Sequence, residues 1–369
     1  MTSVAPNEPA NEHSGEAVSA GVSRRSVIRA AGAGALALGL GGAALTGAPG
    51  ASAATRKGLG PVSEAPGLPP GFWKTFSSEY IRTGGLVQHV VIGGEGPPLL
   101  LVHGWPQTWY AWRLVMPALA RGFRVIAPDQ RGRGLTSKPA DGYDTGTLAG
   151  DLVALMDALG HQKFAVAGHD TGMVISYALA ADHRDRIQAL AVAEAVLPGV
   201  QPSPPLFLPS PLNQQLFHLM FNRLPTMNEQ LVQGREDIYF GFIFDAEAGT
   251  IKLPTYAIRT YLDNLASVPR ALRGSFGFYR AWDVTTAQNA QRATQKLTIP
   301  VLAVGGAESA ADGVGKTMML AADNVQTVVI PGAGHWVAEQ APGPMLSALT
   351  VFLAPYRAAH TARPQSAGV

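Results

Sequence analysis

The segment Gly168-His169-Asp170-Thr171-Gly172 places a carboxylate between two glycines, after an apolar run and before a helical pattern. This is the arrangement of a nucleophile elbow, a tight turn that lifts its central side chain above a sheet. The turn is strained, so small residues must flank it. The helix start that follows favours a negative charge. The alternative interpretation is an ordinary strand–turn–helix in which Asp170 only caps the helix.

Aspartate at the centre of the elbow predicts a chemistry different from that of serine. A carboxylate is already anionic, so it attacks a saturated carbon that bears a leaving group and forms an alkyl ester. His335, in Gly334-His335-Trp336, is the candidate base that activates water against that ester. Epoxides and alkyl halides are the substrates that suit such a nucleophile.

Two carboxylates compete for the role of orienting His335. Glu194 directly ends an apolar run, whereas Glu308 lies in a Gly/Ala/Ser stretch without a bulky residue to bury its charge. The chain order Asp170, Glu194, His335 matches the order of nucleophile, acid and base in enzymes that carry a nucleophile elbow. Glu194 is therefore the predicted acid, and Glu308 is the alternative.

The elements that must position these residues follow from an alternation of short apolar runs with helical patterns. The predicted strands are 86–92, 99–102, 123–127, 164–167, 187–193, 301–304 and 325–330, and the predicted helices are 148–159, 173–181 and 345–353. We expect Thr147 to cap the first of these helices and Gly160 to follow its end. The alternation predicts an α/β fold with a mostly parallel sheet covered by helices on both faces.

This alternation stops between about Leu197 and Asp283. Prolines crowd the start of the region, and the helix-like, aromatic-rich stretches 212–221, 228–244 and 256–282 follow. We interpret residues 198–285 as a helical lid inserted between two parts of the core, 73–197 and 286–358. Residues 359–369 are expected to form a tail.

Composition excludes several classes of function. The chain has 369 residues, no cysteine and a formal net charge of +2. Disulfides, thiolate catalysis and cysteine-bound metals are therefore excluded. A charge this small, without a Lys/Arg run, predicts no nucleic-acid partner. No cluster of side chains has metal-ligand spacing, so we predict neither a metal nor another cofactor.

The N-terminal region predicts export. Ser23-Arg24-Arg25 precedes an uncharged Ala/Gly/Leu stretch, and Ala51-Ser52-Ala53 is a small-x-small cleavage site. Residues 1–53 are similar to a twin-arginine (Tat) signal, and 54–72 would be a leader. This predicts a periplasmic or extracellular location. A membrane anchor is the alternative, but a segment rich in Ala and Gly predicts no stable insertion after cleavage.

Three further segments resemble the epoxide hydrolases of the α/β-hydrolase fold. They are His103-Gly104-Trp105-Pro106-Gln107-Thr108-Trp109, Phe278-Tyr279-Arg280 and Gly332-Ala333-Gly334-His335-Trp336. The resemblance implies that an epoxide and water react to a vicinal diol. It also implies that the backbone N–H groups of Trp105 and Thr171 form an oxyanion hole and that Tyr279 donates to the epoxide oxygen.

Within that family the chain resembles the secreted Cif-like branch. That branch keeps its acid after the sixth strand, where Glu194 stands, and pairs a lid histidine with the lid tyrosine. His218 is the candidate for that histidine, and Tyr239 is the alternative partner of Tyr279. Pro106 departs from the branch, which has glycine there.

Other functions compete with epoxide opening. Haloalkane dehalogenases place Trp after the nucleophile, and fluoroacetate dehalogenases, which act on a haloacid, place Arg there and three residues later. This chain has Thr171 and Val174 at those positions. Serine esterases are excluded by Asp170. A rival of another class is a non-catalytic secreted effector. The sequence leaves open the substrate's size, the regiochemistry, the biological role and whether the chain forms a homodimer.

Overall fold

A computed structural model describes residues 62–205, 207–268 and 270–361. The chain divides into two units, Met1–Gly50 and Ala51–Val369, and all described residues belong to the second. The predicted export signal therefore lies outside the described residues. Within them, no helix has both the length and the apolar character needed to cross a membrane.

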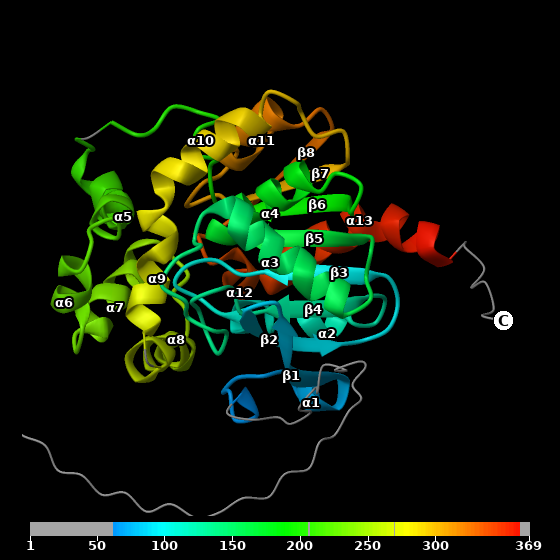
Figure 1. The fold of residues 1–369 in the computed structure, drawn as a ribbon, viewed down its shortest axis with the longest axis horizontal. Helices are drawn as coiled ribbons and strands as arrows, with labels where there is room; N and C mark the ends of the chain where they lie inside the picture. The colour runs from blue at the N-terminus through cyan, green and yellow to red at the C-terminus, as the bar shows by residue number, and fades with distance from the viewer. Residues whose placement is uncertain (1–61, 206, 269, 362–369) are drawn as a thin grey trace, which may run out of the picture. The chain divides into compact units, whose positions relative to one another are not determined.

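An eight-stranded sheet forms the centre of the second unit, in the order β1-β2-β4-β3-β5-β6-β7-β8 (Figure 1). Strands β1, β2 and β4 pair antiparallel, and the remaining pairs are parallel. The strands are β1 (Phe76–Thr83), β2 (Leu86–Gly93), β3 (Pro98–Val102), β4 (Arg124–Pro128), β5 (Phe164–His169), β6 (Ile187–Ala193), β7 (Val301–Gly306) and β8 (Val325–Ile330). The mostly parallel α/β sheet that the sequence predicts is thus confirmed.

Strand β1 is an element that the sequence analysis missed. Its sequence, Phe-Ser-Ser-Glu-Tyr-Ile-Arg-Thr, carries no apolar run. It pairs with β2 along its whole length, from Phe76 opposite Gly93 to Thr83 opposite Leu86. The strand occupies the edge of the sheet, where backbone pairing does not require a continuous apolar sequence.

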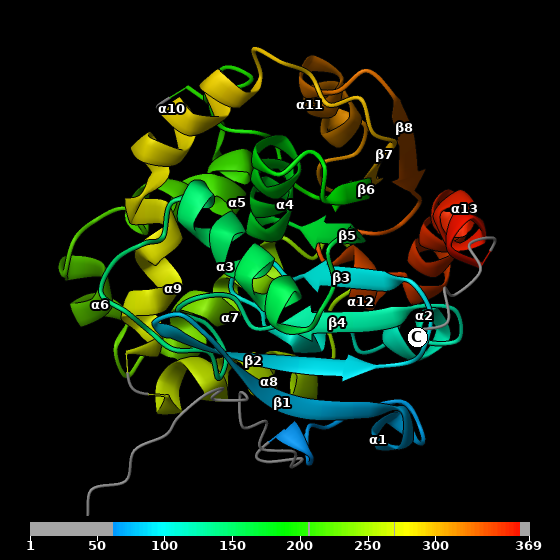
Figure 2. The same cartoon turned by 45° about the vertical axis from the view of Figure 1, so that its right-hand side comes forward.

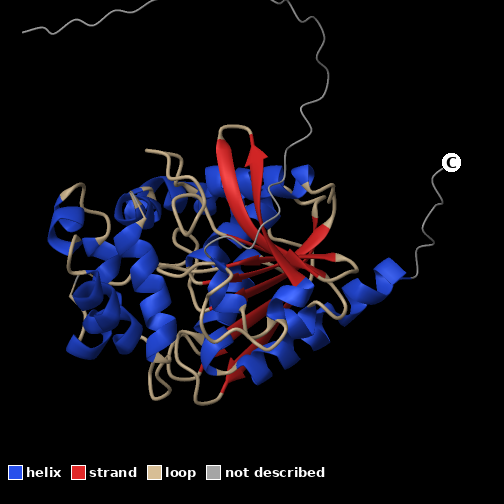
Figure 3. Cartoon of the chain, turned by 90° about the horizontal axis from the view of Figure 1, so that it is seen from below, coloured by secondary structure: helices blue, strands red, loops and turns tan. Residues whose placement is uncertain are grey.

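Helices cover both faces of the sheet (Figure 3). Figure 2 shows α3 and α4 side by side next to the central strands. The core helices are α1 (Phe72–Thr75), η2 (Trp109–Trp112, a 3₁₀ helix), α2 (Met116–Leu119), α3 (Thr145–Ala158), α4 (Thr171–Asp182), α11 (Gly313–Ala321), α12 (Val337–Gln340) and α13 (Pro342–Thr361). Helix α13 extends into the segment predicted as a tail, of which 362–369 lie outside the described residues.

The start of α3 corrects a prediction. The N-cap is Asp144, not Thr147, because the Asp144 side chain accepts a hydrogen bond from the Thr147 backbone N–H at 3.1 Å. Thr147 lies three residues after this cap and supplies the backbone N–H that donates to it. Gly160 follows the helix end with φ 79°, as predicted for a residue in the left-handed region.

Six helices separate β6 from β7 and gather mostly to one side of the sheet (Figure 1, left). They are α5 (Ser210–Phe221), α6 (Met227–Val232), α7 (Glu236–Ala246), α8 (Thr255–Ser267), α9 (Ala271–Arg280) and α10 (Trp282–Arg292). The helix-like stretch 228–244 comprises two helices, α6 and α7, between which the chain turns at Gly234 with φ 75°. The last inserted helix also runs beyond the predicted boundary at 285.

Candidate active site

The elbow between β5 and α4 has the backbone geometry that its sequence predicts. Asp170 adopts φ 52° and ψ −124°, a conformation that costs free energy for a residue with a side chain. A Cβ atom on Gly168 would lie 2.3 Å from the carbonyl oxygen of Gly172. One on Gly172 would lie 2.3 Å from the carbonyl oxygen of Val102. Only glycine fits at both positions.

The two carboxylate oxygens of Asp170 face different partners. The backbone N–H of Trp105 donates a hydrogen bond to Oδ1 at 2.7 Å. Oδ2 lies 3.8 Å from Nε2 of His335. The loop after β3, which carries Gly104 and Trp105, can approach Asp170 this closely because Gly104 has no side chain. A Cβ atom on Gly104 would lie 2.5 Å from Cβ of Asp170. One oxygen is thus fixed by the backbone, and the other faces the histidine.

Thr171 is the first residue of α4 and directly follows Asp170. The amides of a helix's first turn have no intrahelical partner, so they remain available to an oxygen at the elbow. Its hydroxyl is buried and has no hydrogen-bond partner among the described residues. The Thr171 amide thus lies at the helix start, directly after the candidate nucleophile.

His335 is held from three directions in the loop after β8. Nδ1 donates to Oε2 of Glu194 at 3.2 Å, and the backbone N–H donates to the carbonyl of Glu247 at 3.0 Å. The carbonyl of His335 accepts a hydrogen bond from Nε2 of His169 at 2.7 Å. These bonds fix the ring with Nε2 directed to Asp170.

The structure brings Glu194, and not Glu308, to His335. Glu194 follows β6 with φ 65° and is buried. Its Oε1 accepts from the backbone N–H of Gly306, so both carboxylate oxygens are occupied. Glu308 is exposed and accepts from the backbone N–H of Thr250.

Negative charges surround His335. Burial alone would lower its pKa, but Glu247, Glu194 and Asp170 outweigh burial and raise the pKa to about 9. The imidazolium form is therefore favoured while Asp170 carries its charge. Loss of that charge would make the ring easier to deprotonate.

His218 and Tyr279 come together around the indole of Trp105. The Trp105 ring stacks on His218 with centroids 5.0 Å apart and meets Tyr279 edge-on at 5.2 Å. Its Nε1 donates to Oγ of Ser275 in α9 at 2.8 Å. The rings of His218 and Tyr279 are perpendicular, with centroids 5.8 Å apart. Trp105, in the loop after β3, thus contacts two inserted helices, α5 through His218 and α9 through Tyr279 and Ser275.

The hydroxyl of Tyr239, the alternative lid partner, donates to Oδ1 of Asn222 at 2.5 Å and is occupied. Burial lowers the pKa of His218 to about 4, although the Asp170 charge opposes the shift. Burial, reinforced by the Asp170 charge, raises the pKa of Tyr279 well above its ordinary value. Both lid groups are therefore neutral near pH 7.

Two charged residues at the site were missed in the sequence. Glu247 follows α7, and its carboxylate lies between His218 and His335. Arg133 is buried and donates from Nη1 to the carbonyl of Gly104 at 3.3 Å. Burial lowers the pKa of Arg133 to about 10, although its interactions with Tyr279 and Asp170 oppose the shift. The two glycines that flank Arg133 after β4 could have indicated a functional loop in the sequence. The residues around Glu247, 244–248, contain no such motif.

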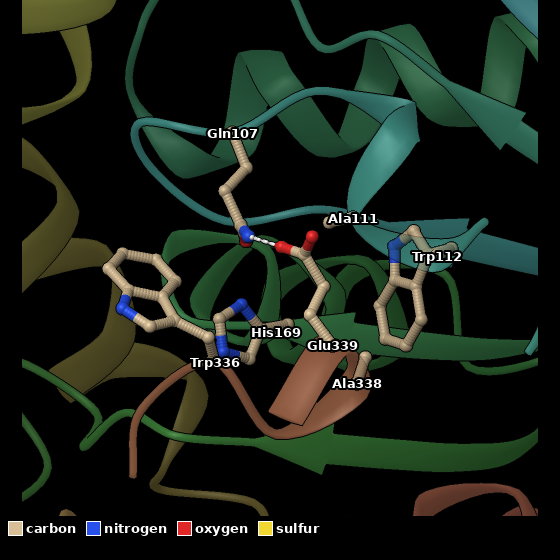
Figure 4. A pocket seen from close by; sticks show the side chains of 7 residues that line it. All are labelled: Gln107, Ala111, Trp112, His169, Trp336, Ala338 and Glu339. Atoms are coloured by element: carbon tan, nitrogen blue, oxygen red, sulfur yellow. Dashed lines mark hydrogen bonds between the residues drawn. The ribbon is translucent and has the colours of Figure 1, made fainter. Parts of the chain in front are cut away.

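A small cavity lies behind the elbow (Figure 4), lined by Gln107, Ala111, Trp112, His169, Trp336, Ala338 and Glu339. Its volume is about 10 Å³, roughly the space of one water molecule. Nε2 of Gln107 donates to Oε2 of Glu339 at 2.7 Å. The cavity is too small for an organic substrate, so its polar groups support the site from behind.

Among the described residues, no group of three or more His, Cys, Asp or Glu side chains is arranged to hold a metal ion.

Comparisons with known proteins agree on one family. The model of the alpha/beta hydrolase fold matches residues 97–342. A soluble epoxide hydrolase from Corynebacterium sp. (strain C12) is 34% identical over 277 residues, which cover 74% of this chain and 96% of that protein. Epoxide hydrolase A from Mycobacterium tuberculosis is 29% identical, with coverage of 74% and 96%. The crystal structure of Cfl2 from Burkholderia cenocepacia superposes with a TM-score of 0.73 at 30% identity, covering 77% of this chain and 98% of that one.

Proposed function

The chain belongs to the epoxide hydrolases of the α/β-hydrolase fold, and we propose that it opens an epoxide to a vicinal diol through an ester of Asp170. The observation that carries the proposal is the asymmetry of the Asp170 carboxylate. Oδ1 accepts from the Trp105 amide, and Oδ2 faces Nε2 of His335. Oδ2 would attack carbon, while Oδ1 is held by one of the two amides proposed for the oxyanion hole.

In the first step Oδ2 of Asp170 attacks a ring carbon of the epoxide. A C–O bond of the epoxide breaks, and an ester bond to Asp170 forms. The hydroxyl of Tyr279 would donate to the alkoxide, and the grouping of Tyr279 with His218 around Trp105 supports that assignment. The neutral His218 donates its Nδ1 proton to the carbonyl of Gln215 at 2.9 Å and would line the site beside Tyr279. The raised pKa of Tyr279 keeps its hydroxyl protonated and able to donate.

In the second step His335 takes a proton from water, and the resulting hydroxide attacks Cγ of the ester. Negative charge then develops on Oδ1, where the amides of Trp105 and Thr171 would stabilise it. Esterification has removed the charge of Asp170, which is one of the causes of the raised pKa of His335. The pKa of His335 therefore falls at the step that requires a free base.

We also propose that the chain is Cif-like. The bond of His335 to Glu194, which follows β6, supports this assignment, as does the pairing of His218 with Tyr279. Export through the Tat route remains our proposal for residues 1–53. It is supported by the twin arginines and the cleavage site in the sequence.

Dehalogenation is the less favoured chemistry at this site. A halide needs a donor next to the nucleophile, and Thr171 supplies no ring N–H. The two nearby indoles are occupied, since Trp105 donates to Ser275 and Trp336 donates to the carbonyl of Phe244.

A turnover assay tests the proposal. The purified protein should convert styrene oxide to its diol, and Asp170→Ser should abolish the conversion, because a neutral hydroxyl does not displace the epoxide oxygen without further activation. Retained diol formation in the Asp170→Ser variant would remove the central role of Asp170. Absence of turnover in the unaltered protein over a panel of epoxides would instead favour a non-catalytic effector.

A further inference from the structure

Glu247 is a buried carboxylate that the two steps above do not use. It follows α7, and its side chain is 10% exposed. Oε1 lies 3.4 Å from Nδ1 of His218, and Oε2 lies 3.7 Å from Nε2 of His335. One carboxylate therefore contacts both the lid histidine and the base.

The surroundings of His335 Nε2 define a position for a small polar molecule. This nitrogen is buried and has no hydrogen-bond partner among the described residues. Oε2 of Glu247 and Oδ2 of Asp170 lie 3.7 Å and 3.8 Å from it. Hydrogen bonds of about 2.8 Å place one water oxygen within reach of both Nε2 and Oε2. That position is also next to the carboxyl group that becomes the ester.

Building on the proposed function, we propose that Glu247 is a water-binding residue of the ester hydrolysis step. Together with His335 it holds the water that attacks the Asp170 ester. One O–H group of the water faces Nε2, and the other donates to Oε2 of Glu247. The oxygen's remaining lone pair then points to the ester carbonyl.

The atoms balance in this arrangement. One O–H bond of the water breaks, its proton moves to Nε2 of His335, and the oxygen forms a bond to Cγ of Asp170. The bond from Cγ to the alkyl oxygen then breaks, and that oxygen takes the hydroxyl proton of the intermediate. The proton on His335 balances the one that Tyr279 gave up during ring opening, and its return to Tyr279 restores both groups. Epoxide and water thus give the diol without net proton change.

The charge of Glu247 would change when the ester forms. Burial, together with the charges of Asp170 and Glu194, raises its pKa to about 8, although His335 opposes the shift. Esterification removes the Asp170 charge, so the pKa of Glu247 falls and its accepting, ionised form is favoured. The other titratable groups that face Glu247 are His218 from α5, Tyr239 from α7 and Tyr279 from α9.

The backbone fixes the distance between Glu247 and the base. The carbonyl of Glu247 accepts from the N–H of His335 at 3.0 Å. A Cβ atom on Gly334 would lie 2.2 Å from the carbonyl oxygen of Ala248, so the loop can contact the end of α7 only with glycine there. Because the two backbones are joined by this hydrogen bond, the position of Glu247 relative to His335 is fixed.

Rapid-quench mass spectrometry with styrene oxide measures formation and decay of the Asp170 ester separately. Glu247→Leu removes the acceptor and should slow ester decay roughly 10- to 100-fold, a modest share of what a positioned proton-transfer site contributes. Ester formation should stay close to the wild-type rate. The pH below which ester decay slows should be lower than in the wild type. The charge of Glu247 helps to raise the pKa of His335, so its removal lowers that pKa.

Glu247→Gln keeps an acceptor oxygen without the charge. It should therefore recover part of the decay rate lost in Glu247→Leu, while the pH profile of ester decay stays shifted to lower pH. Glu308→Gln, a change at an exposed glutamate, is the control and should alter neither step. Wild-type ester decay in Glu247→Leu would overturn the inference. So would an equal loss in both steps with an unmoved pH profile, which would indicate a structural role. If no variant and not even the wild type carried an adduct on Asp170, the proposed function itself would fail.

Discussion

At the scale of single residues, the structure clearly distinguishes the two candidate acids, Glu194 and Glu308. Glu194 contacts Nδ1 of His335 at 3.2 Å, whereas the carboxylate of Glu308 accepts from the backbone N–H of Thr250. A carboxylate bound to Nδ1 holds the tautomer and stabilises the imidazolium that forms during water activation.

We therefore expect Glu194→Gln to slow decay of the Asp170 ester far more than its formation, since formation needs no base. Glu308→Gln should leave both rates unchanged. Single-turnover kinetics with styrene oxide distinguishes the two variants. Accumulation of ester in the Glu308 variant alone would contradict the assignment of the acid.

At the scale of residues, sequence is most informative where a motif fixes the backbone. Asp170 is flanked by glycines whose positions admit no side chain, and such a turn can be identified from sequence. Glu247 could not be found in the same way. It reaches the site because α7 ends against the loop of His335, a contact between segments nearly ninety residues apart. Nothing in the local sequence encodes that contact.

At the scale of elements, apolar runs identified both the buried strand β6 and the edge strand β8 with their predicted bounds. A polar strand and the inserted helices were harder to identify. Strand β1 carries polar residues, and the helices between β6 and β7 end at turns such as Gly234 that long aromatic patterns conceal. The cap of α3 was assigned three residues too late, because both Asp144 and Thr147 are good capping types.

The corrected cap gives a stability prediction. Asp144→Ala should lower the free energy of unfolding by about 1 kcal/mol, because the first-turn N–H of Thr147 loses its acceptor. Thr147→Ala keeps that backbone bond and should cost less. Urea unfolding of the two variants checks the order, and a larger loss for Thr147→Ala would show that Thr147 is the cap after all.

At the scale of the whole molecule, buried neutral histidines make stability depend on pH. The ring of His103 accepts from the N–H of Gln130 at Nε2 and donates from Nδ1 to the carbonyl of Gly104. Burial, with a contribution from Arg133, lowers its pKa to about 4. The unfolded chain therefore binds a proton between about pH 6.5 and 4 that the folded chain does not.

Stability contributed by a neutral His103 is present above about pH 6.5 and is lost as the pH falls toward 4. Relative to His103→Gln, the wild type should lose up to about 1.4 kcal/mol of unfolding free energy per pH unit in this range. Urea unfolding of both proteins at several pH values measures the difference. A difference that stays constant with pH would contradict a neutral, buried ring.

The central claim is a covalent cycle through Asp170, and His335→Gln tests it most directly. Attack by the carboxylate needs no base, whereas hydrolysis of the ester does. After exposure to styrene oxide, the variant should gain the mass of one epoxide, and peptide mapping should locate the adduct on Asp170. A variant that turns over normally without an adduct, or one alkylated at another residue, would contradict the account.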